Sequence, residues 1–552
     1  MPSPSAVMPD TSATASAGST TGPEARVLIV MTGGTICMRS SPSGLVPADG
    51  FLESALEPMP IFNDYSDPPN IDVVVSDDGT TKKYRSLRTP PTMYGASIRY
   101  AVYEFDELLD SSSIDAKGWA QIARTVYRNY TLFDAFVILH GTDSLAYSCS
   151  ALSFMMQNLG KPVVLTGSQA PIFELQTDAT NNLLGSLVVA AHFMIPEVGL
   201  YFDNKLFRGN RTTKVSASAF AAFDSPNVPP LAVTTAMRTV VAWDLVHRPT
   251  QISNFSIQTN LDTTHVACLR IFPGIKPEMV DAVLRLEGLR GLVLETFGAG
   301  NAPGGQDDAM VKVLAEAIKR GIVIVNVTQC MSGSVSPVYA PGMTLSRAGV
   351  VAGLDMTTEA ALTKLAYLLA LPDSTPETIA RDMSRSLRGE LTEASTPVFR
   401  HPEQPDDAHH LADRDKTFAA LAYAVVRGQL GRVEDLIRGR DWALNEVDYS
   451  GNTLLHLAAT SPDITMLRFF LTHGAPVHAR NRQGRTPLFM AASMGLEEHV
   501  QLLKASGAHL HADEKGIARL AAKKATIQGL RGTGRAWEIA LGKNMKEGNG
   551  EV

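Results

Sequence analysis

The chain has 552 residues, with 49 Lys and Arg against 56 Asp and Glu, a formal net charge of −7 and 45% apolar residues. One hydrophobic core does not grow to this length, so we expect several domains. The weakly negative balance gives no basic footprint, and no stretch of about 18 uncharged apolar residues occurs. We therefore expect neither a nucleic-acid partner nor a membrane partner.

The four cysteines, Cys37, Cys149, Cys268 and Cys330, are far apart and form no C-x-x-C pair. This spacing indicates neither a disulfide framework nor a cysteine-based metal site, and it fits a reducing compartment. Residues 1–25 are rich in Ser, Thr, Ala and Pro and lack the apolar core of a secretory signal. We expect a disordered leader on a cytoplasmic protein.

Short apolar runs that end in small polar residues begin at Arg26. The runs and their polar ends are Val27 to Val30 before Thr32-Gly-Gly-Thr35, Phe136 to Leu139 before His140-Gly-Thr-Asp143, and Val163 to Leu165 before Thr166-Gly-Ser168. Continuous rather than alternating apolar strands, separated by helical segments, are typical of a parallel sheet that is covered on both faces. The sequence therefore predicts an α/β domain over 26–249, with ligands outside the carboxyl ends of its strands.

Composition divides the chain further as far as about residue 415. Residues 51–105 are irregular and rich in Pro and Asp, so we expect an insertion there, and polar residues 250–264 suggest a linker. A second series of strands and helices predicts a smaller α/β domain over 265–392. A polar, Pro-containing linker is expected over 393–415.

An internal repeat follows. Gly451, Thr453, Leu455, Ala458 and Gly474 recur 33 residues later as Gly484, Thr486, Leu488, Ala491 and Gly507. This period and its motif resemble the ankyrin repeat. We expect an all-α solenoid over 416–542, with atypical capping units at both ends and a short tail at 543–552.

Taken singly, the polar residues at the strand ends have ordinary structural explanations. Thr and Ser after a strand most often cap the next helix, Gly33-Gly34 permits a tight turn, and Lys214 would be a solvated loop residue. Together they offer hydroxyl nucleophiles, a carboxylate and a lysine that burial can shift toward neutrality, which are the parts of a metal-free hydrolase. The G-x-S-x-G, H-E-x-x-H and P-loop motifs of competing classes are absent from the sequence.

The motifs between about Arg26 and Leu391 resemble those of the L-asparaginases, specifically the cytosolic type I branch. They are Thr32-Gly-Gly-Thr-Ile36, Asp110-Ser-Ser112, His140-Gly-Thr-Asp143, Leu165-Thr-Gly-Ser-Gln169, Arg208-Gly-Asn-Arg-Thr-Thr-Lys214 and Gly300-Asn-Ala-Pro303. With the repeats, the chain resembles the animal asparaginase/lysophospholipase architecture. The resemblance implies a two-domain asparaginase-like parallel-sheet fold followed by the all-α ankyrin solenoid.

The resemblance also implies catalytic roles. Thr35 would be the nucleophile that attacks the side-chain amide carbon, giving an acyl-enzyme and ammonia. Thr142, Asp143 and Lys214 would form a second triad that activates a nucleophile or the hydrolytic water.

Substrate-binding roles are implied in the same way. Asp110, Ser111 and Ser112 would hold the α-amino and α-carboxylate groups of the amino acid, with Thr142 and Asp143 also near it. Ser168 would lie beside the amide that is cleaved. Acceptors and donors within one small pocket suit a zwitterionic substrate.

The sequence departs from the family pattern at two places. Leu45 follows the loop glycine where many asparaginases carry a tyrosine that activates the first threonine, and Tyr339 is the tyrosine that could replace it, the alternative being a packed or surface side chain. Glu295 stands where allosteric type I enzymes carry an effector-binding arginine. We therefore expect no asparagine-driven cooperativity.

The leading expectation is hydrolysis of L-asparagine to L-aspartate and ammonia, with no cofactor and no metal, by a homodimer or homotetramer. One alternative is a lysophospholipase or acyltransferase, which would need a long apolar groove. Another is a catalytically weak scaffold that binds a protein partner through the ankyrin repeats. A purely structural or oligomerising role for the repeats is also open.

Overall fold

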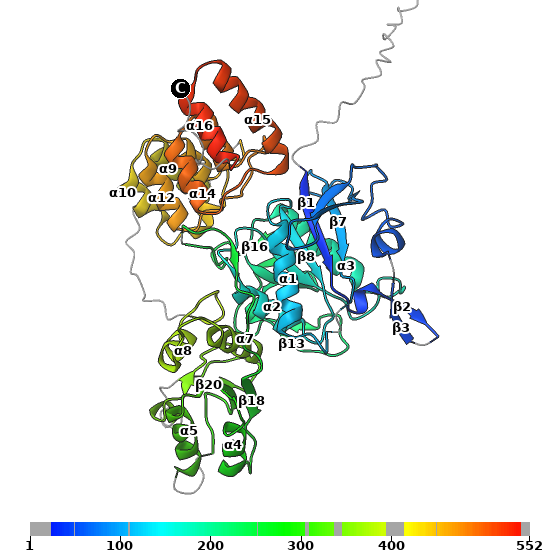
Figure 1. Ribbon diagram of the computed structural model, residues 1–552, viewed down its shortest axis with the longest axis vertical. Helices are drawn as coiled ribbons and strands as arrows, with labels where there is room; N and C mark the ends of the chain where they lie inside the picture. The colour runs from blue at the N-terminus through cyan, green and yellow to red at the C-terminus, as the bar shows by residue number, and fades with distance from the viewer. Residues whose placement is uncertain are drawn as a thin grey trace, which may run out of the picture.

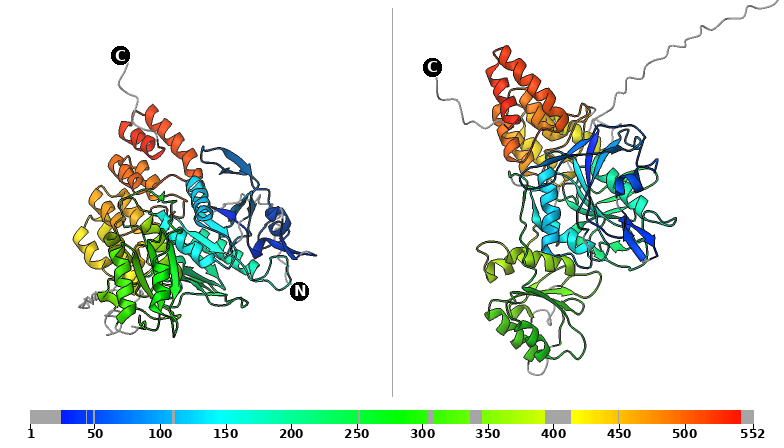
Figure 2. Two further views of the ribbon diagram at one scale, coloured as in Figure 1. Left: turned by 60° about the horizontal axis from the view of Figure 1, so that its bottom comes forward. Right: turned by 45° about the vertical axis from the view of Figure 1, so that its right-hand side comes forward.

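The computed structural model describes residues 24–42, 44–48, 50–108, 111–250, 252–303, 308–335, 345–392, 413–448 and 450–542. An α/β unit with a large sheet comes first, a smaller α/β unit follows, and helical repeats come last (Figure 1). The smaller α/β unit and the repeats lie at opposite ends of the first unit in Figure 1 and in the right-hand view of Figure 2.

The first unit is built on a nine-stranded sheet with the order β16-β15-β12-β11-β10-β8-β1-β7-β6. Its central strands β7, β1, β8, β10 and β11 are parallel, as the apolar runs predict, and antiparallel strands close both edges. The strands are β1 (Ala25–Met31), β6 (Leu87–Arg88), β7 (Ile98–Glu104), β8 (Ala135–Leu139), β10 (Val163–Thr166), β11 (Val198–Phe202), β12 (Lys205–Arg208), β15 (Ala232–Thr234) and β16 (Thr239–Val241).

Strand β7 lies beside β1, although its residues fall in the segment that the sequence predicted to be an insertion. That prediction was wrong for the end of the segment. Arg99 interrupts the apolar run of β7, but its side chain is buried, and it donates hydrogen bonds to Ser86 and to the Pro69 carbonyl. Because these acceptors lie 13 and 30 residues away, local sequence could not show that the arginine is compatible with a central strand.

Smaller elements complete the first unit. These are the hairpin strands β2 (Met38–Ser41) and β3 (Gly44–Pro47), a π-helical turn (Leu52–Leu56), and strands β4 (Ile71–Val74), β5 (Thr81–Tyr84), β9 (Met156–Gln157), β13 (Thr213–Lys214), β14 (Phe223–Asp224) and β17 (Ser256–Ile257). Strand β17, in the segment between the two α/β units, pairs with β9 of the first unit.

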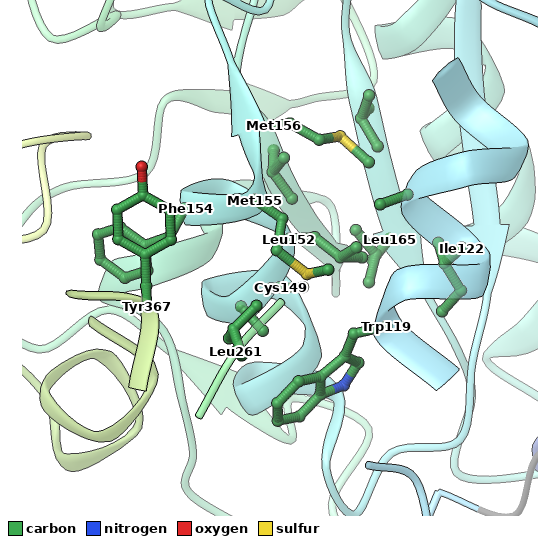
Figure 3. Close-up of a cluster of buried hydrophobic side chains, with 14 of the residues drawn as sticks. Trp119, Ile122, Cys149, Leu152, Phe154, Met155, Met156, Leu165, Leu261 and Tyr367 are labelled. Atoms are coloured by element: carbon green, nitrogen blue, oxygen red, sulfur yellow. The ribbon is translucent and has the colours of Figure 1, made fainter. Parts of the chain in front are cut away.

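Helices α1 (Ala116–Asn129) and α2 (Leu145–Met155) bury apolar side chains on one face of the sheet, and α3 (Ala179–His192) packs on the other face. Figure 3 shows Trp119 of α1 beside α2, and Phe154 beside Tyr367, whose rings stack 5.9 Å apart. Since Tyr367 belongs to the second α/β unit, one continuous core joins the two units.

The second unit is a parallel sheet in the order β18 (Val266–Arg270), β19 (Gly291–Thr296), β20 (Val323–Thr328) and β21 (Val351–Ala352). Its helices are α4 (Pro277–Leu284), α5 (Ala309–Lys319), α7 (Thr358–Leu369) and α8 (Pro376–Met383). This fold class is the one that the sequence predicts.

The carboxy-terminal unit stacks helix pairs, as predicted for ankyrin repeats. They are α9 (Asp413–Val426) with α10 (Leu430–Ile437), α11 (Leu454–Thr460) with α12 (Ile464–Thr472), α13 (Pro487–Ser493) with α14 (Glu497–Ala505), and α15 (Ala512–Ile527) with α16 (Arg531–Ala540). The buried His456 links successive repeats, because it contacts the Thr453 hydroxyl and the Arg485 carbonyl at 2.9 Å each. None of the helices in the described ranges combines the length and apolarity needed to cross a membrane.

Candidate active site at the carboxyl edge of the sheet

From β1 the chain runs to β7 on one side of β1, and from β7 it crosses to β8 on the other side. This reversal of strand order opens a crevice at the carboxyl ends of these strands. The strands also end level with one another, since Met31 pairs with Leu139 and Leu139 with Thr166. The three loops with polar motifs therefore begin side by side.

A cavity of about 440 Å³ occupies this crevice. Six of its lining residues carry polar side chains suited to chemistry or binding, namely Thr35, Ser111, Thr142, Asp143, Gln169 and Lys214. The rest of the lining is Gly33, Gly34, Cys37, Met38, Pro47, Leu108, Gly141 and Ala217. The structure thus brings together five residues that the sequence singled out, with Gln169 in addition.

Glycines allow the loops to approach this closely. A Cβ atom built on Gly34, whose φ is +93°, would lie 2.4 Å from the Gly141 nitrogen. One built on Gly141 would lie 2.3 Å from Ser111 Oγ. Both distances are far below contact, so the glycines of the two motifs are needed for packing between loops, beyond the turn that we expected Gly33-Gly34 to provide.

Lys214 connects the two polar residues of the loop after β8. Its Nζ donates to Thr142 Oγ1 at 3.0 Å and to Asp143 Oδ1 at 2.9 Å. The Thr142 hydroxyl in turn donates to Gln169 Oε1 at 3.3 Å. The lysine side chain is 22% exposed and the aspartate side chain 67%, so this group faces the cavity rather than the core.

Thr35 begins a single 3₁₀ turn, Thr35–Cys37, immediately after the Gly33-Gly34 pair. It is half-buried and lines the cavity, and its hydroxyl has no hydrogen-bond partner among the residues that the structure describes. Cys37 behind it is buried, which together with the charge of Glu104 raises the pKa of its thiol and keeps it protonated. Burial therefore leaves the Cys37 thiol protonated, whereas Thr35 brings a hydroxyl group to the cavity lining.

His140 supports the loop from below. Its Nδ1 lies 2.7 Å from the Gly141 carbonyl, to which it must donate, and its Nε2 lies 2.9 Å from Ser148 Oγ. The serine also accepts a hydrogen bond from Trp119 Nε1 at 2.8 Å. Burial lowers the pKa of His140, and a neutral ring satisfies every bond in this series, so helices α1 and α2 fix the loop that carries Thr142.

Two other expected site residues lie outside the cavity lining. Ser168 is buried, donates to the Ala170 carbonyl at 2.5 Å, and is not part of the cavity lining; Ser112 is exposed and also outside the lining. Asp110 and Tyr339 fall outside the described residues. Leu45 lies on β3, 48% exposed, in a hairpin that extends outward from the body of the unit (Figure 1).

Gln169 is the lining residue to which the sequence reasoning gave no role. It directly follows Ser168 in a motif that was recognised, and its backbone nitrogen is held by the Asp178 carboxylate at 3.0 Å. Its place at the end of the Leu165-Thr-Gly-Ser-Gln169 motif was the sequence signal that could have identified it as a site residue.

Comparisons with known proteins match both α/β units and the repeats to known families. The model of the asparaginase amino-terminal domain matches residues 26–247, that of the glutaminase/asparaginase carboxy-terminal domain matches residues 265–383, and that of ankyrin repeats matches residues 421–514. The chain also resembles a solved structure, L-asparaginase I of Vibrio cholerae, with 38% identity and a TM-score of 0.56 over 67% of this chain and 100% of that one.

Two relatives share most of their length with the chain. The 60 kDa lysophospholipase of Mus musculus is 40% identical over 467 residues, which cover 82% of this chain and 80% of the relative. The L-asparaginase of Dirofilaria immitis is 36% identical over 507 residues, which cover 90% and 84%. The chain belongs to the asparaginase family, with ankyrin repeats following its two asparaginase domains.

Proposed function

We propose that the protein is an L-asparaginase that hydrolyses L-asparagine to L-aspartate and ammonia through an acyl-threonine intermediate, acting as a homodimer or homotetramer. The observation that carries the proposal is the convergence of Thr35 with the Lys214–Thr142–Asp143 group in one cavity at the switch point of the sheet. A cavity of about 440 Å³ with several polar groups suits a small zwitterion.

In the proposed reaction, Thr35 Oγ attacks the side-chain amide carbon and a base in the cavity takes its proton. The proton passes to the leaving nitrogen, ammonia departs, and an ester of aspartate with Thr35 remains. Water then attacks the ester, with Lys214, Thr142 and Asp143 positioned to orient and deprotonate it. Asp110, Ser111 and Ser112 would bind the α-amino and α-carboxylate groups of the substrate. Ser168 would lie beside the amide that is cleaved.

Lysophospholipid hydrolysis is the second candidate, because a relative with the same order of domains bears that name. The lining disfavours it for this cavity, since six polar side chains surround the space where an acyl chain would have to lie. The scaffold alternative predicts no turnover of either substrate.

The test measures ammonia release from L-asparagine and fatty-acid release from a lysophosphatidylcholine by the purified full chain. Thr35→Ala and Thr142→Ala are run beside the wild type, and Thr35→Ser serves as the matched control that keeps a hydroxyl. We expect ammonia release that both alanine variants abolish and that Thr35→Ser partly retains. Fatty-acid release without ammonia release, or no turnover at all, would refute the proposal.

A further inference from the structure

The ankyrin repeats rest against the amino-terminal edge of the large sheet, the edge opposite the cavity (Figure 1). His478 and His511 stand 33 residues apart, at equivalent positions of successive repeats. Their rings and that of His509 form a triangle, with centroids 4.5 to 6.1 Å apart. The His478 and His509 rings are 4.5 Å apart, and both pack edge-on against Tyr130 of the first α/β unit, which carries the proposed active site and is called the catalytic unit below. The repeat loops thus hold this chain's own catalytic unit.

Lys161 of the catalytic unit enters this histidine cluster. Its side chain is fully buried, and its Nζ donates to the Tyr130 and Phe133 carbonyls at 2.6 and 2.7 Å. The same atom lies 2.9 Å from His509 Nε2. One hydrogen fits between these two nitrogens, so the pair holds at most one extra proton, because charging both would place two buried cations in contact.

The other charged groups at the contact are already paired or are cations. Asp134 of the catalytic unit pairs with His511 at 2.5 Å, and Arg480 pairs with Asp513. Glu514 is fully buried and accepts from the His511 backbone nitrogen at 2.9 Å and from Thr486. Lys515 is half-buried beside Lys161. Among the described residues, none of these carboxylates directly pairs with His478 or His509.

We propose that the ankyrin repeats clamp the catalytic unit of the same chain, with the repeat loops bound to the amino-terminal edge of its large sheet. Protonation of His478 and His509 separates the repeats from that edge. A protein that binds the same loops competes with the catalytic unit for them.

The sign of the pH dependence follows from the buried histidines. Burial, followed by the charges of Lys161 and neighbouring histidines, lowers the pKa of both His478 and His509 well below the ordinary value. In the separated state each would titrate near pH 6.5, so the two histidines do not oppose docking above that pH and weaken it as pH falls below it. Between pH 7.5 and 5.5 each histidine weakens docking about tenfold, and the two together about 100-fold.

Asp134 does not act in this window. Burial raises the pKa of its carboxyl, but the charges of His511, Lys161 and Arg480 outweigh that effect and hold the pKa below its usual range. Its carboxylate charge is therefore lost only below about pH 4, outside the range of the test.

The experiment is hydrogen–deuterium exchange on the full chain at pH 7.5 and 5.5, corrected for intrinsic exchange. The reporting segments are residues 128–136 and 158–164 of the catalytic unit and 474–482 and 505–512 of the repeats. Small-angle scattering measures separation of the units, and circular dichroism checks that the helices persist. Variants are His478→Gln, the double variant His478→Gln/His509→Gln, and the matched control His473→Gln, whose histidine is exposed on the same repeat.

We expect the wild type and His473→Gln to lose protection in all four segments at pH 5.5, with helix content retained and the radius of gyration increased. The single variant His478→Gln keeps the Lys161–His509 contact and should show about a tenfold effect, and the double variant almost none. Equal protection at both pH values in the wild type, or an undiminished effect in the single variant, would overturn the proposal. None of these readouts depends on catalysis.

Discussion

Replacement of Lys214 should lower activity while leaving the stability of the fold almost unchanged. Its ammonium bonds both Thr142 and Asp143, yet it lies on the two-residue strand β13 at the cavity wall and supports no core packing. We predict that Lys214→Met lowers kcat for L-asparagine at least about 100-fold with little change in the melting temperature. Steady-state ammonia release tests this, with Lys82→Met on an exposed strand as the control; a variant that keeps most of its kcat would remove Lys214 from the mechanism.

Gly34 tests whether close packing of the loops matters for the site. Gly34→Ala introduces a Cβ 2.4 Å from the Gly141 nitrogen, so the Thr35 turn or the His140 loop has to move. Gly79→Ala is the matched control, because Gly79 has a similar φ of +84° and nothing within 4 Å. We predict that Gly34→Ala lowers the free energy of unfolding by about 2–4 kcal/mol and abolishes activity. Gly79→Ala should lower the free energy of unfolding less and keep full activity. Urea denaturation and ammonia release measure the two effects. Equal effects in the two variants would show that backbone strain alone matters.

At the scale of elements, α7 is tied to the segment after α8 by a fully buried ion pair. Lys364 Nζ lies 2.6 Å from Glu390 Oε1, and both side chains are 0% exposed. Glu390→Gln leaves the ammonium without its countercharge, which costs about 3–5 kcal/mol. We predict a lower urea midpoint for unfolding of the two α/β units, which share one core, while the exposed Glu377→Gln leaves the midpoint unchanged. An unshifted midpoint in Glu390→Gln would mean that the pair is replaceable.

The order of the central strands could be anticipated only in part. Apolar runs identified β1, β8 and β10 because both faces of these strands are buried. Strand β7 was missed because Arg99 interrupts its apolar run. The acceptors that allow this arginine to be buried come together only in the folded chain. Strand β17, two residues long, exists through its pairing with β9 about 100 residues earlier, which no local pattern records.

The sequence indicated part of the residue set that lines the cavity. Strand ends and motif identity located Thr35, Ser111, Thr142, Asp143 and Lys214, and all five line the cavity. The sequence could not show that Ser168 turns its hydroxyl to the Ala170 carbonyl while the next side chain reaches the cavity, because that depends on a turn held by the Asp178 carboxylate.

At the scale of the whole molecule, substitutions at the amino-terminal edge of the large sheet should change stability, and substitutions at its carboxyl edge should change catalysis. Lys161→Met leaves the buried Tyr130 and Phe133 carbonyls and His509 without their donor, each worth about 1–3 kcal/mol. We predict a lower melting temperature with kcat and KM for L-asparagine unchanged, measured by calorimetry and ammonia release. Lys117→Met, on the exposed face of α1, is the control. A fall in kcat would show that the two edges are coupled.

Strand β8 joins these edges directly, because Asp134 precedes it at the repeat contact and the loop that brings Thr142 to the cavity follows it. Five residues of extended chain, about 17 Å, separate the two functions. Loops at one end can therefore change with the substrate while the surface at the other end acquires or loses an appended module. The parallel sheet lets chemistry and attachment evolve as independent traits within a single domain.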